Sequence, residues 1–189
     1  NESPHKKSDV LSHLKGSRDV IPKLNETYKL GNATIKVIDV SAEQPNDSLV
    51  LLINHGDTNF LFTGDIEKQA HSRVASVLRE MSDDLKAGDN LIKMPHHGAY
   101  NSDRFLPDNA SDNSLATLIS AAYAKYFVIS VGSNNKYKHP HQNTLDLIEQ
   151  VLDMDELNKA THLFRTDYNG NIIATSDGNK ITVTPSKCA

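Results

Sequence analysis

Two short stretches of this sequence place potential metal ligands directly after an apolar run. Asp65 follows NFLFTG, and the adjacent His96 and His97 follow NLIKMP. Carboxylate oxygen and imidazole nitrogen suit zinc, manganese or iron, and a carboxylate can bridge two such ions. Each residue also has a simpler interpretation, because an aspartate after a strand is often a turn residue or a helix N-cap. The order and spacing of the motifs together favour a metal site.

A third apolar run, YFVISVG at 126–132, leads into the polar segment SNNKYK and then His139-Pro140-His141. Catalytic groups commonly lie on loops that a rigid sheet positions. If the ends of the three runs converge on one edge of a sheet, a carboxylate and several imidazoles meet there. The alternative is a rigid turn whose imidazoles cap the following helix.

Hydrophobic periodicity predicts the elements that must position these side chains. Apolar residues with helical spacing predict an amphipathic helix over 67–81. The other predicted elements are a short helix at 7–15, two strands within 28–40 that turn at Gly31-Asn32, a hairpin of 48–53 and 59–64 around 55–58, a strand at 90–94, a helix at 114–123, a strand at 126–132, a helix at 143–152, a hairpin of 161–167 and 171–177 around Tyr168-Asn169-Gly170, and a strand at 180–184. This mixture indicates an α/β or α+β fold with layered sheets.

Composition limits the classes of function. The chain has 189 residues, 38% hydrophobic and 23% charged, which is typical of one soluble globular domain. No apolar run approaches the roughly 20 residues of a membrane span, so we expect no span in this chain. A net charge of -4 provides no overall basic field, so nucleic-acid binding would need a local patch or metal ions. The lone Cys188 excludes a disulfide framework and a cysteine-rich zinc site.

Five motifs in order resemble those of the metallo-β-lactamase-fold hydrolases of the competence protein ComEC type. The resemblance runs from about residue 28 to residue 178. The motifs are 46–51 (NDSLVL), 62–67 (FTGDIE), 91–98 (LIKMPHHG) with Asn101-Ser102, 129–132 (ISVG) with Asn135, Tyr137 and 139–141 (HPH), and 164–167 (FRTD) with Asn169-Gly170.

The resemblance implies a four-layer αββα sandwich with its metals along one edge, between the two sheets. It implies that Asp65 bridges two divalent ions, zinc or manganese. It further implies that His96 binds the second ion, with His97 as the alternative because the two are adjacent. His139 or His141 would contact a phosphate or protonate a leaving oxygen.

The resemblance also implies a set of substrate-binding residues: Asn46, Ser48, Ser102, Asn135, Tyr137 and His139. Ala99 stands where the family commonly has serine. A local phosphate-facing patch would be formed by Lys93, Arg104, Lys136 and Lys138.

One motif of the family is missing from this chain. The His-x-His-x-Asp-His motif supplies most ligands of the first metal, and the sequence contains no such pattern. A four-coordinate zinc normally needs three or four protein ligands, so Asp65 and His96 alone would leave both ions under-coordinated. We therefore expect residues 1–189 to form a single metallo-β-lactamase-like domain that lacks its N-terminal half, and that half to be a partner supplying the remaining ligands.

The expected function is metal-dependent hydrolysis of a phosphodiester, by a phosphodiesterase or a nuclease that uses a metal-bound hydroxide at a binuclear site. One alternative is a phosphorylcholine-type or other small-molecule esterase of the same fold. Another is a non-catalytic binding module, because the first metal motif is absent. The sequence leaves localisation open, although the resemblance to a DNA-uptake protein suggests the outer side of a bacterial membrane.

Overall fold

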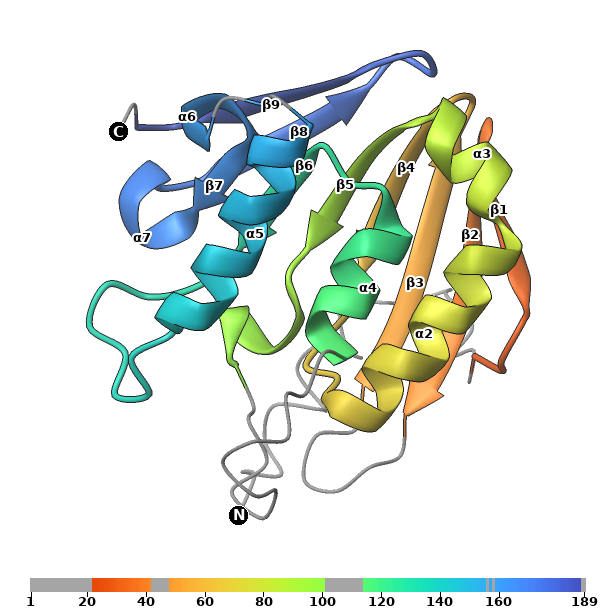
Figure 1. Ribbon diagram of the computed structural model, residues 1–189. Coiled ribbons are helices and arrows are strands. Elements are labelled where there is room, and N and C mark those ends of the chain that lie inside the picture. The colour runs from red at the N-terminus through yellow and green to blue at the C-terminus, as the bar shows by residue number, and fades with distance from the viewer. Residues whose placement is uncertain (1–21, 42–47, 101–113, 156, 158, 188–189) are drawn as a thin grey trace, which may run out of the picture.

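The computed structural model describes residues 22–41, 48–100, 114–155, 157 and 159–187. Seven strands form one mixed sheet in the chain order β1 to β7, and β8 and β9 form a separate two-stranded sheet (Figure 1). The expected mixed α/β class is confirmed. The helix expected at 7–15 lies outside the described residues.

The first four strands form antiparallel hairpins, as predicted from their turns. Gly31 and Gly56 have positive φ values of 60° and 58° at these turns, a conformation that glycine adopts without steric cost. The strands are β1 (Thr27–Leu30), β2 (Ala33–Ser41), β3 (Ser48–His55) and β4 (Thr58–Phe62).

From β4 onward the strands run parallel, with β4 pairing β5, β5 pairing β6 and β6 pairing β7. The later strands are β5 (Asp89–Lys93), β6 (Tyr126–Ile129) and β7 (Leu163–Arg165). Parallel neighbours end at the same edge of a sheet, so the segments that follow β4, β5 and β6 must start close together. This edge is where the sequence places its aspartate and histidines.

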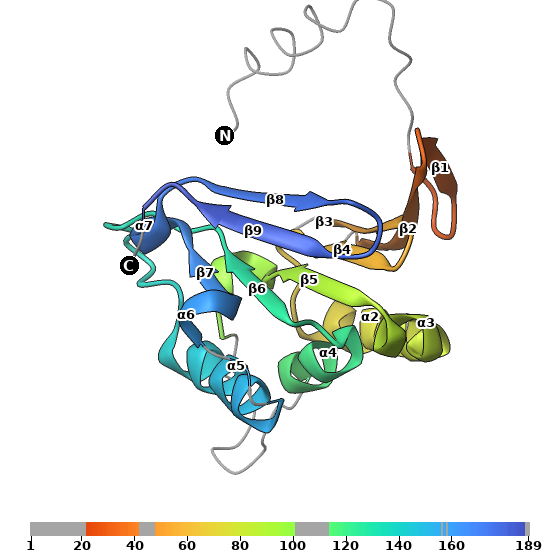
Figure 2. The same cartoon turned by 90° about the horizontal axis from the view of Figure 1, so that it is seen from above.

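Helices between the parallel strands cover one face of the large sheet (Figure 2). They are α2 (Lys68–Glu80), α3 (Ser82–Ala87), α4 (Ser114–Ala122), α5 (Gln142–Met154) and α6 (Lys159–His162). In α2, Ala70, Val74 and Leu78 are fully buried and lie on one side of the helix, as the periodicity predicted. They pack with Leu118 of α4 and Ile92 of β5 in the core.

The predicted last hairpin, 161–167 with 171–177, is wrong. β7 pairs in parallel with β6, whereas β8 (Ile172–Ser176) pairs with β9 (Ile181–Pro185). The short helix α7 (Thr166–Asn169) and Gly170, with φ 68°, lie between the two runs and send the chain from the large sheet to the small one. The turn residues were recognised correctly, but β7 pairs with a strand that is distant in sequence, and β8 pairs with the strand that follows it.

The β8–β9 hairpin lies on the face of the large sheet opposite the helices (Figure 2). The Asp89 carboxylate accepts a hydrogen bond from the Ile181 N–H at 2.7 Å, and Asp89 is only 9% exposed. Beside it, the Ser176 hydroxyl lies 2.9 Å from His55 Nδ1 and 2.6 Å from the Thr58 hydroxyl. Polar contacts therefore fix the small sheet to the large one.

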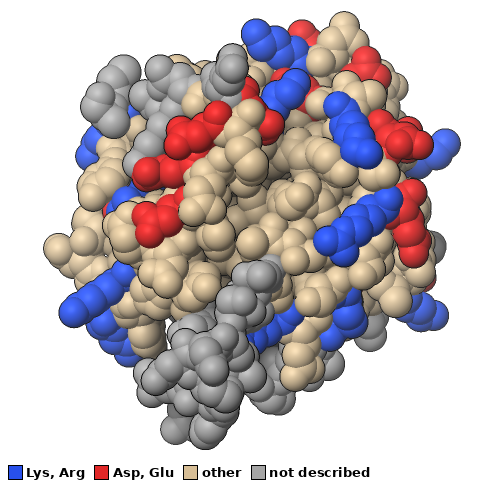
Figure 3. Space-filling model, in the orientation of Figure 1, with Lys and Arg blue, Asp and Glu red and all other residues tan. Residues whose placement is uncertain are grey.

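No described helix is long and apolar enough to cross a membrane. On the helix-covered side of the molecule, Lys and Arg alternate with Asp and Glu over α2 and α3, and the centre is uncharged (Figure 3). The part of this side formed by described residues thus presents no continuous basic surface to a nucleic acid.

Replacing Asp89 with alanine should lower the free energy of unfolding by about 1–3 kcal/mol, because the buried Ile181 N–H would lose its acceptor. Urea denaturation would measure the change. Asp153→Ala, which removes an exposed carboxylate of α5, should change stability by less than about 0.5 kcal/mol. Equal stabilities of the two variants would contradict this account of the docked hairpin.

Candidate metal-binding site

The histidines that follow β5 and β6 lie together at the carboxyl edge of the parallel strands. The ring centroid of His96 is 6.5 Å from that of His97 and 5.6 Å from that of His139. His139 in turn lies 4.8 Å from His141. The expected convergence of the strand ends is therefore found, and Asp65 shares the same edge through His97.

The turn after β5 (Pro95–Gly98) has an unusual backbone. His96, His97 and Gly98 have φ values of 45°, 56° and 79°. A left-handed conformation costs a non-glycine residue about 1–2 kcal/mol, so two histidines adopt it only where surrounding contacts enforce it. Two such contacts are hydrogen bonds from His96 N–H to Gly64 O at 3.1 Å and from His141 N–H to Gly98 O at 3.0 Å. Backbone outliers of this kind cluster at functional sites.

His97 is oriented towards Asp65. Its Nδ1 lies 2.6 Å from Ser130 O, and since a carbonyl only accepts, Nδ1 carries the proton. In the neutral ring Nε2 then has a lone pair, and this atom lies 3.7 Å from Asp65 Oδ1. Two ligands at zinc–ligand distances of about 2.0–2.1 Å, in tetrahedral geometry, are about 3.3 Å apart. A small movement would let one ion bind both atoms, so the geometry favours His97 over His96 as the partner of Asp65.

His96 has a carboxylate neighbour of its own. Its Nδ1 lies 3.4 Å from Glu67 Oε1. A carboxylate in this position commonly orients a metal-binding imidazole from behind, so the arrangement keeps His96 as an alternative ligand. Sequence reasoning placed Glu67 at the start of a helix and at the end of the 62–67 motif but gave it no role at the site; its position two residues after Asp65 was the available signal.

The donor set is incomplete within the described part of the chain. No group of three or more His, Cys, Asp or Glu side chains there is arranged to hold a metal ion. Asp65 and His97 thus fit two ligands of an ion that needs three or four from protein. The described residues therefore form at most part of a metal-binding site.

Lys93, the last residue of β5, places its ammonium group beside the Asp65 carboxylate at this edge. Its ammonium donates a hydrogen bond to Gly64 O at 3.0 Å and lies 3.7 Å from Asp65 Oδ1. Burial lowers the pKa of Lys93, and the attraction of Asp65 opposes that shift. Lys93 therefore ties the end of β5 to the segment that carries Asp65.

Two residues of the loop after β6 position His139. Asn135 accepts from the His139 N–H and donates to the His139 carbonyl, both at 2.8 Å. His141 accepts from the Tyr100 N–H at 2.9 Å, and its Nε2 lies 3.3 Å from Tyr137 O. Asn135 makes its contacts within this loop, and His141 contacts the loop and Tyr100. His139 is the ring of the loop that faces His96.

Of the other expected site residues, Ser48 has a supporting contact and three lie outside the described residues. Ser48, at the start of β3, accepts a hydrogen bond from the Asp65 N–H at 2.9 Å and so holds the backbone of the candidate ligand. Thr166 belongs to the 164–167 motif but had no expected role; it accepts a hydrogen bond from the Val131 N–H at 2.7 Å and ties the ends of β6 and β7 together. Asn46 and Ser102 lie outside the described residues, as does Arg104.

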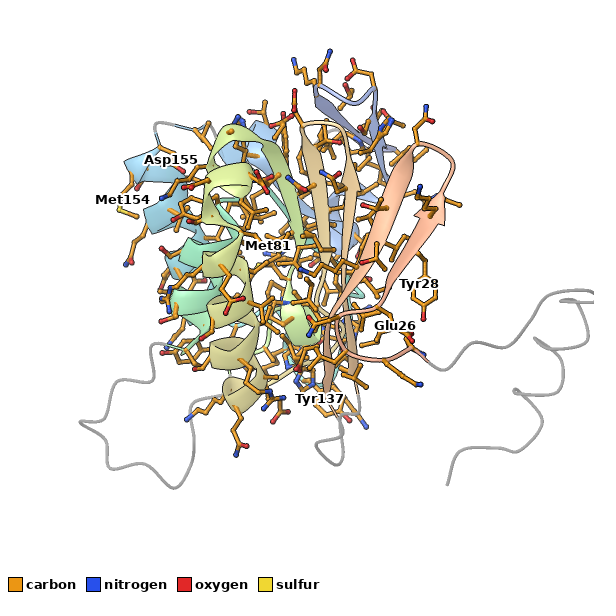
Figure 4. The ribbon with its side chains drawn as sticks, turned by 90° about the vertical axis from the view of Figure 1, so that its right-hand side faces the viewer. Glu26, Tyr28, Met81, Tyr137, Met154 and Asp155 are labelled. Carbon is orange, nitrogen blue, oxygen red and sulfur yellow. The ribbon has the colours of Figure 1, made fainter. Side chains whose placement is uncertain are left out.

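A cavity of about 360 Å³ adjoins the histidine cluster. It is lined by His97, Ser130, Val131, Gly132, Asn135, Tyr137, His139 and Thr166. A second cleft of about 430 Å³ lies between α3 and the other end of the sheet, where Asn54, Asn59 and Asn90 form a row of amide hydrogen bonds. Figure 4, which labels Tyr137 and the cleft residue Met81, shows the two regions well apart. The second cleft has no histidine among its lining residues, whereas both His97 and His139 line the first, which is therefore the candidate substrate cavity.

A mixed α/β protein with an aspartate and several histidines at the carboxyl edge of its parallel strands is the class that these observations define. The chain is similar to ComE operon protein 3 of Bacillus subtilis (strain 168), with 30% identity over 154 residues. That alignment covers 79% of this chain and 17% of the relative's length. No family model matches the sequence, and no solved structure matches it.

Gly98→Ala should destabilise the site. An added Cβ would lie 2.7 Å from Pro140 Cβ, and alanine at φ 79° is strained. We expect the free energy of unfolding to fall by about 1–3 kcal/mol, measured by urea denaturation. Gly132→Ala is the control, because a Cβ there meets no atom within 4 Å. A destabilisation by Gly132→Ala as large as that by Gly98→Ala would contradict the proposed packing of the turn against Pro140.

His139 should titrate below the ordinary histidine pKa in the metal-free chain. Burial is the largest cause of the lowered pKa of His139. Repulsion from His141, His96 and His97 lowers this pKa further. The unfolded chain then binds the His139 proton more readily than the folded chain, so this residue's contribution to stability is lost as pH falls below its unfolded pKa of about 6.5. NMR titration of the ring protons measures the pKa, and a value at or above the ordinary histidine value of about 6.5 would contradict the prediction.

Proposed function

We propose that this chain forms part of a metal-dependent phosphodiester hydrolase, a phosphodiesterase or nuclease with a metallo-β-lactamase-like site. The observation that carries the proposal is the pair Asp65 Oδ1 and His97 Nε2, 3.7 Å apart and next to His139 at one sheet edge. The similarity to ComE operon protein 3 supports it, and so does the resemblance of the motifs to the ComEC-type hydrolases.

Each residue has a role in this proposal. Asp65 and His97 hold zinc or manganese, with His96 as the alternative ligand. When bound, a pair of such ions would supply activated water at neutral pH and would offset charge on the attacked phosphorus. His139, which its lowered pKa keeps neutral, donates a hydrogen bond to a phosphate or leaving oxygen. Lys93 and Ser48 hold the segment around Asp65 in place.

The face of the large sheet opposite the helices, which the described residues cover only in part, supports the proposal of a missing half of the domain. Leu52 of β3 pairs with Leu61 of β4, and both are in the core beneath the helices. Side chains alternate along a strand, so Leu51, Ile53 and Phe62 lie on the opposite face. That face is apolar yet incompletely buried, and Phe62 is 41% exposed.

A sheet with an apolar face normally packs against a second layer, and two sheets pack about 10 Å apart. The β8–β9 hairpin supplies two strands of such a layer. We infer that further strands beside this hairpin cover Leu51, Ile53 and Phe62 and complete a four-layer αββα sandwich. The segment that carries them would also supply the remaining metal ligands.

A non-catalytic binding module is the second candidate, favoured by the incomplete donor set among the described residues. A small-molecule esterase of the same fold is the third. Turnover of single-stranded DNA and of a small diester, compared in a protein that includes the missing half, separates a nuclease from an esterase. In that protein His97→Ala should lower kcat/KM by about 100-fold or more, since even outer-shell partners of metal ligands contribute about 10–100-fold.

The chain alone should bind metal weakly at the proposed edge. After exhaustive dialysis, elemental analysis should give far fewer than two metal ions per chain. Added Mn²⁺ should broaden the NMR signals of Asp65 and His97 through its unpaired electrons, and Asp65→Asn should abolish the effect. The His55 ring, at the opposite end of β3 from Ser48, serves as an internal control.

Two outcomes would count against the proposal. Two tightly bound ions per chain would mean that the donor set is complete here, and the half-site would be rejected. Broadening centred on Asp57 and Asp84 in the second cleft, with Asp65 and His97 unaffected, would place metal binding elsewhere.

A further inference from the structure

The loop after β6 presents an aromatic ring beside the candidate site. Tyr137 is 64% exposed, and Figure 4 shows it at one end of the molecule. Its ring centroid lies 5.8 Å from that of His139, with 25° between the ring planes. The nearby contacts of Asn135 and His141 fix the loop backbone, so the ring is presented on a firm support.

The cavity beside this ring has a suitable size and lining for a flat heterocycle. Its volume of about 360 Å³ lies within the range of small-molecule sites. Tyr137 and His139 provide aromatic walls, Val131 provides an apolar surface, and Gly132 leaves open space where a side chain would stand. Because His97 also lines the cavity, a ring bound there would be next to the proposed metal edge.

Positive charge accompanies the ring. The Lys136 ammonium lies 4.8 Å from the Tyr137 ring centroid, and Lys136 and Lys138 are both exposed. A lysine on its flexible stem can leave the ring face for a phosphate when a flat group stacks there. An aromatic platform with neighbouring lysines is the combination by which proteins bind single-stranded nucleic acid without sequence preference.

We propose that Tyr137 is a specificity-determining residue that stacks on a base of a single-stranded nucleic acid, next to the phosphodiester held at Asp65 and His97. The inference rests on the proposed function for the identity of that phosphodiester. It adds that the substrate must carry a flat base beside the bond to be cut. Lys136 and Lys138 contact the flanking phosphates.

Binding in the presence of EDTA tests the inference without hydrolysis. Fluorescence anisotropy would compare the affinity of this chain for a labelled thymidine oligonucleotide with that for an abasic strand of the same length. Tyr137→Ala should weaken binding of the thymidine strand by about 5- to 100-fold, the range observed for loss of one stacking contact, and change abasic binding little. Tyr137→Phe should bind the thymidine strand like the original chain.

Tyr123→Ala is the matched control. Tyr123 is also exposed, and the Lys86 ammonium lies 5.3 Å from its ring centroid, but it precedes β6 at the opposite edge of the sheet. The control should bind both strands normally. Thermal unfolding of each variant checks that the fold is retained.

The inference would be overturned if Tyr137→Ala lost the same affinity for both strands, or lost none. It would also be overturned if the original chain bound the two strands with equal affinity, or bound neither detectably. Failure of the proposed function has a different signature, which is base-dependent binding by this chain without metal-dependent hydrolysis by the completed domain. Conversely, hydrolysis with the same kcat/KM on thymidine and abasic strands would retain the hydrolase and reject the stacking role.

Discussion

The parallel alignment of β4, β5, β6 and β7 is the constraint on which the rest of the structure depends. It brings the carboxyl ends of these strands to one edge, although the segments that follow them are far apart in sequence. Asp65, His97 and His139 come from three such segments, and a ladder of backbone hydrogen bonds sets their spacing. If one strand paired in the opposite direction, its polar residue would lie at the other end of the molecule.

Local signals in the sequence predicted much of this arrangement. The Gly31-Asn32 turn and the turn residues at 55–58 indicated the hairpins, and apolar spacing indicated α2. The failure at residues 161–177 has a clear physical cause. The strand after α6 had an apparent partner nearby in sequence, but its stable partner, β6, lies more than thirty residues earlier. Short-range patterns do not carry that pairing.

The candidate site was predicted in location but not in detail. The sequence identified the adjacent histidines, yet a backbone carbonyl, Ser130 O, orients His97. No residue type marks such a contact. The strand expected over 126–132 ends at Ile129, because β7 has only three residues and Thr166 takes over the Val131 N–H. These side-chain contacts shape the loop that holds His139.

Orientation of His97 by a main-chain atom has an evolutionary consequence. Every amino acid has a main-chain carbonyl, so a substitution of the exposed side chain at position 130 would keep the hydrogen bond to His97. The constraint falls instead on the path of the backbone, which the Val131 to Thr166 hydrogen bond fixes one residue later. Among related sequences, variability at position 130 alongside an unchanged hydroxyl at position 166 would be the signature of a histidine that the backbone orients.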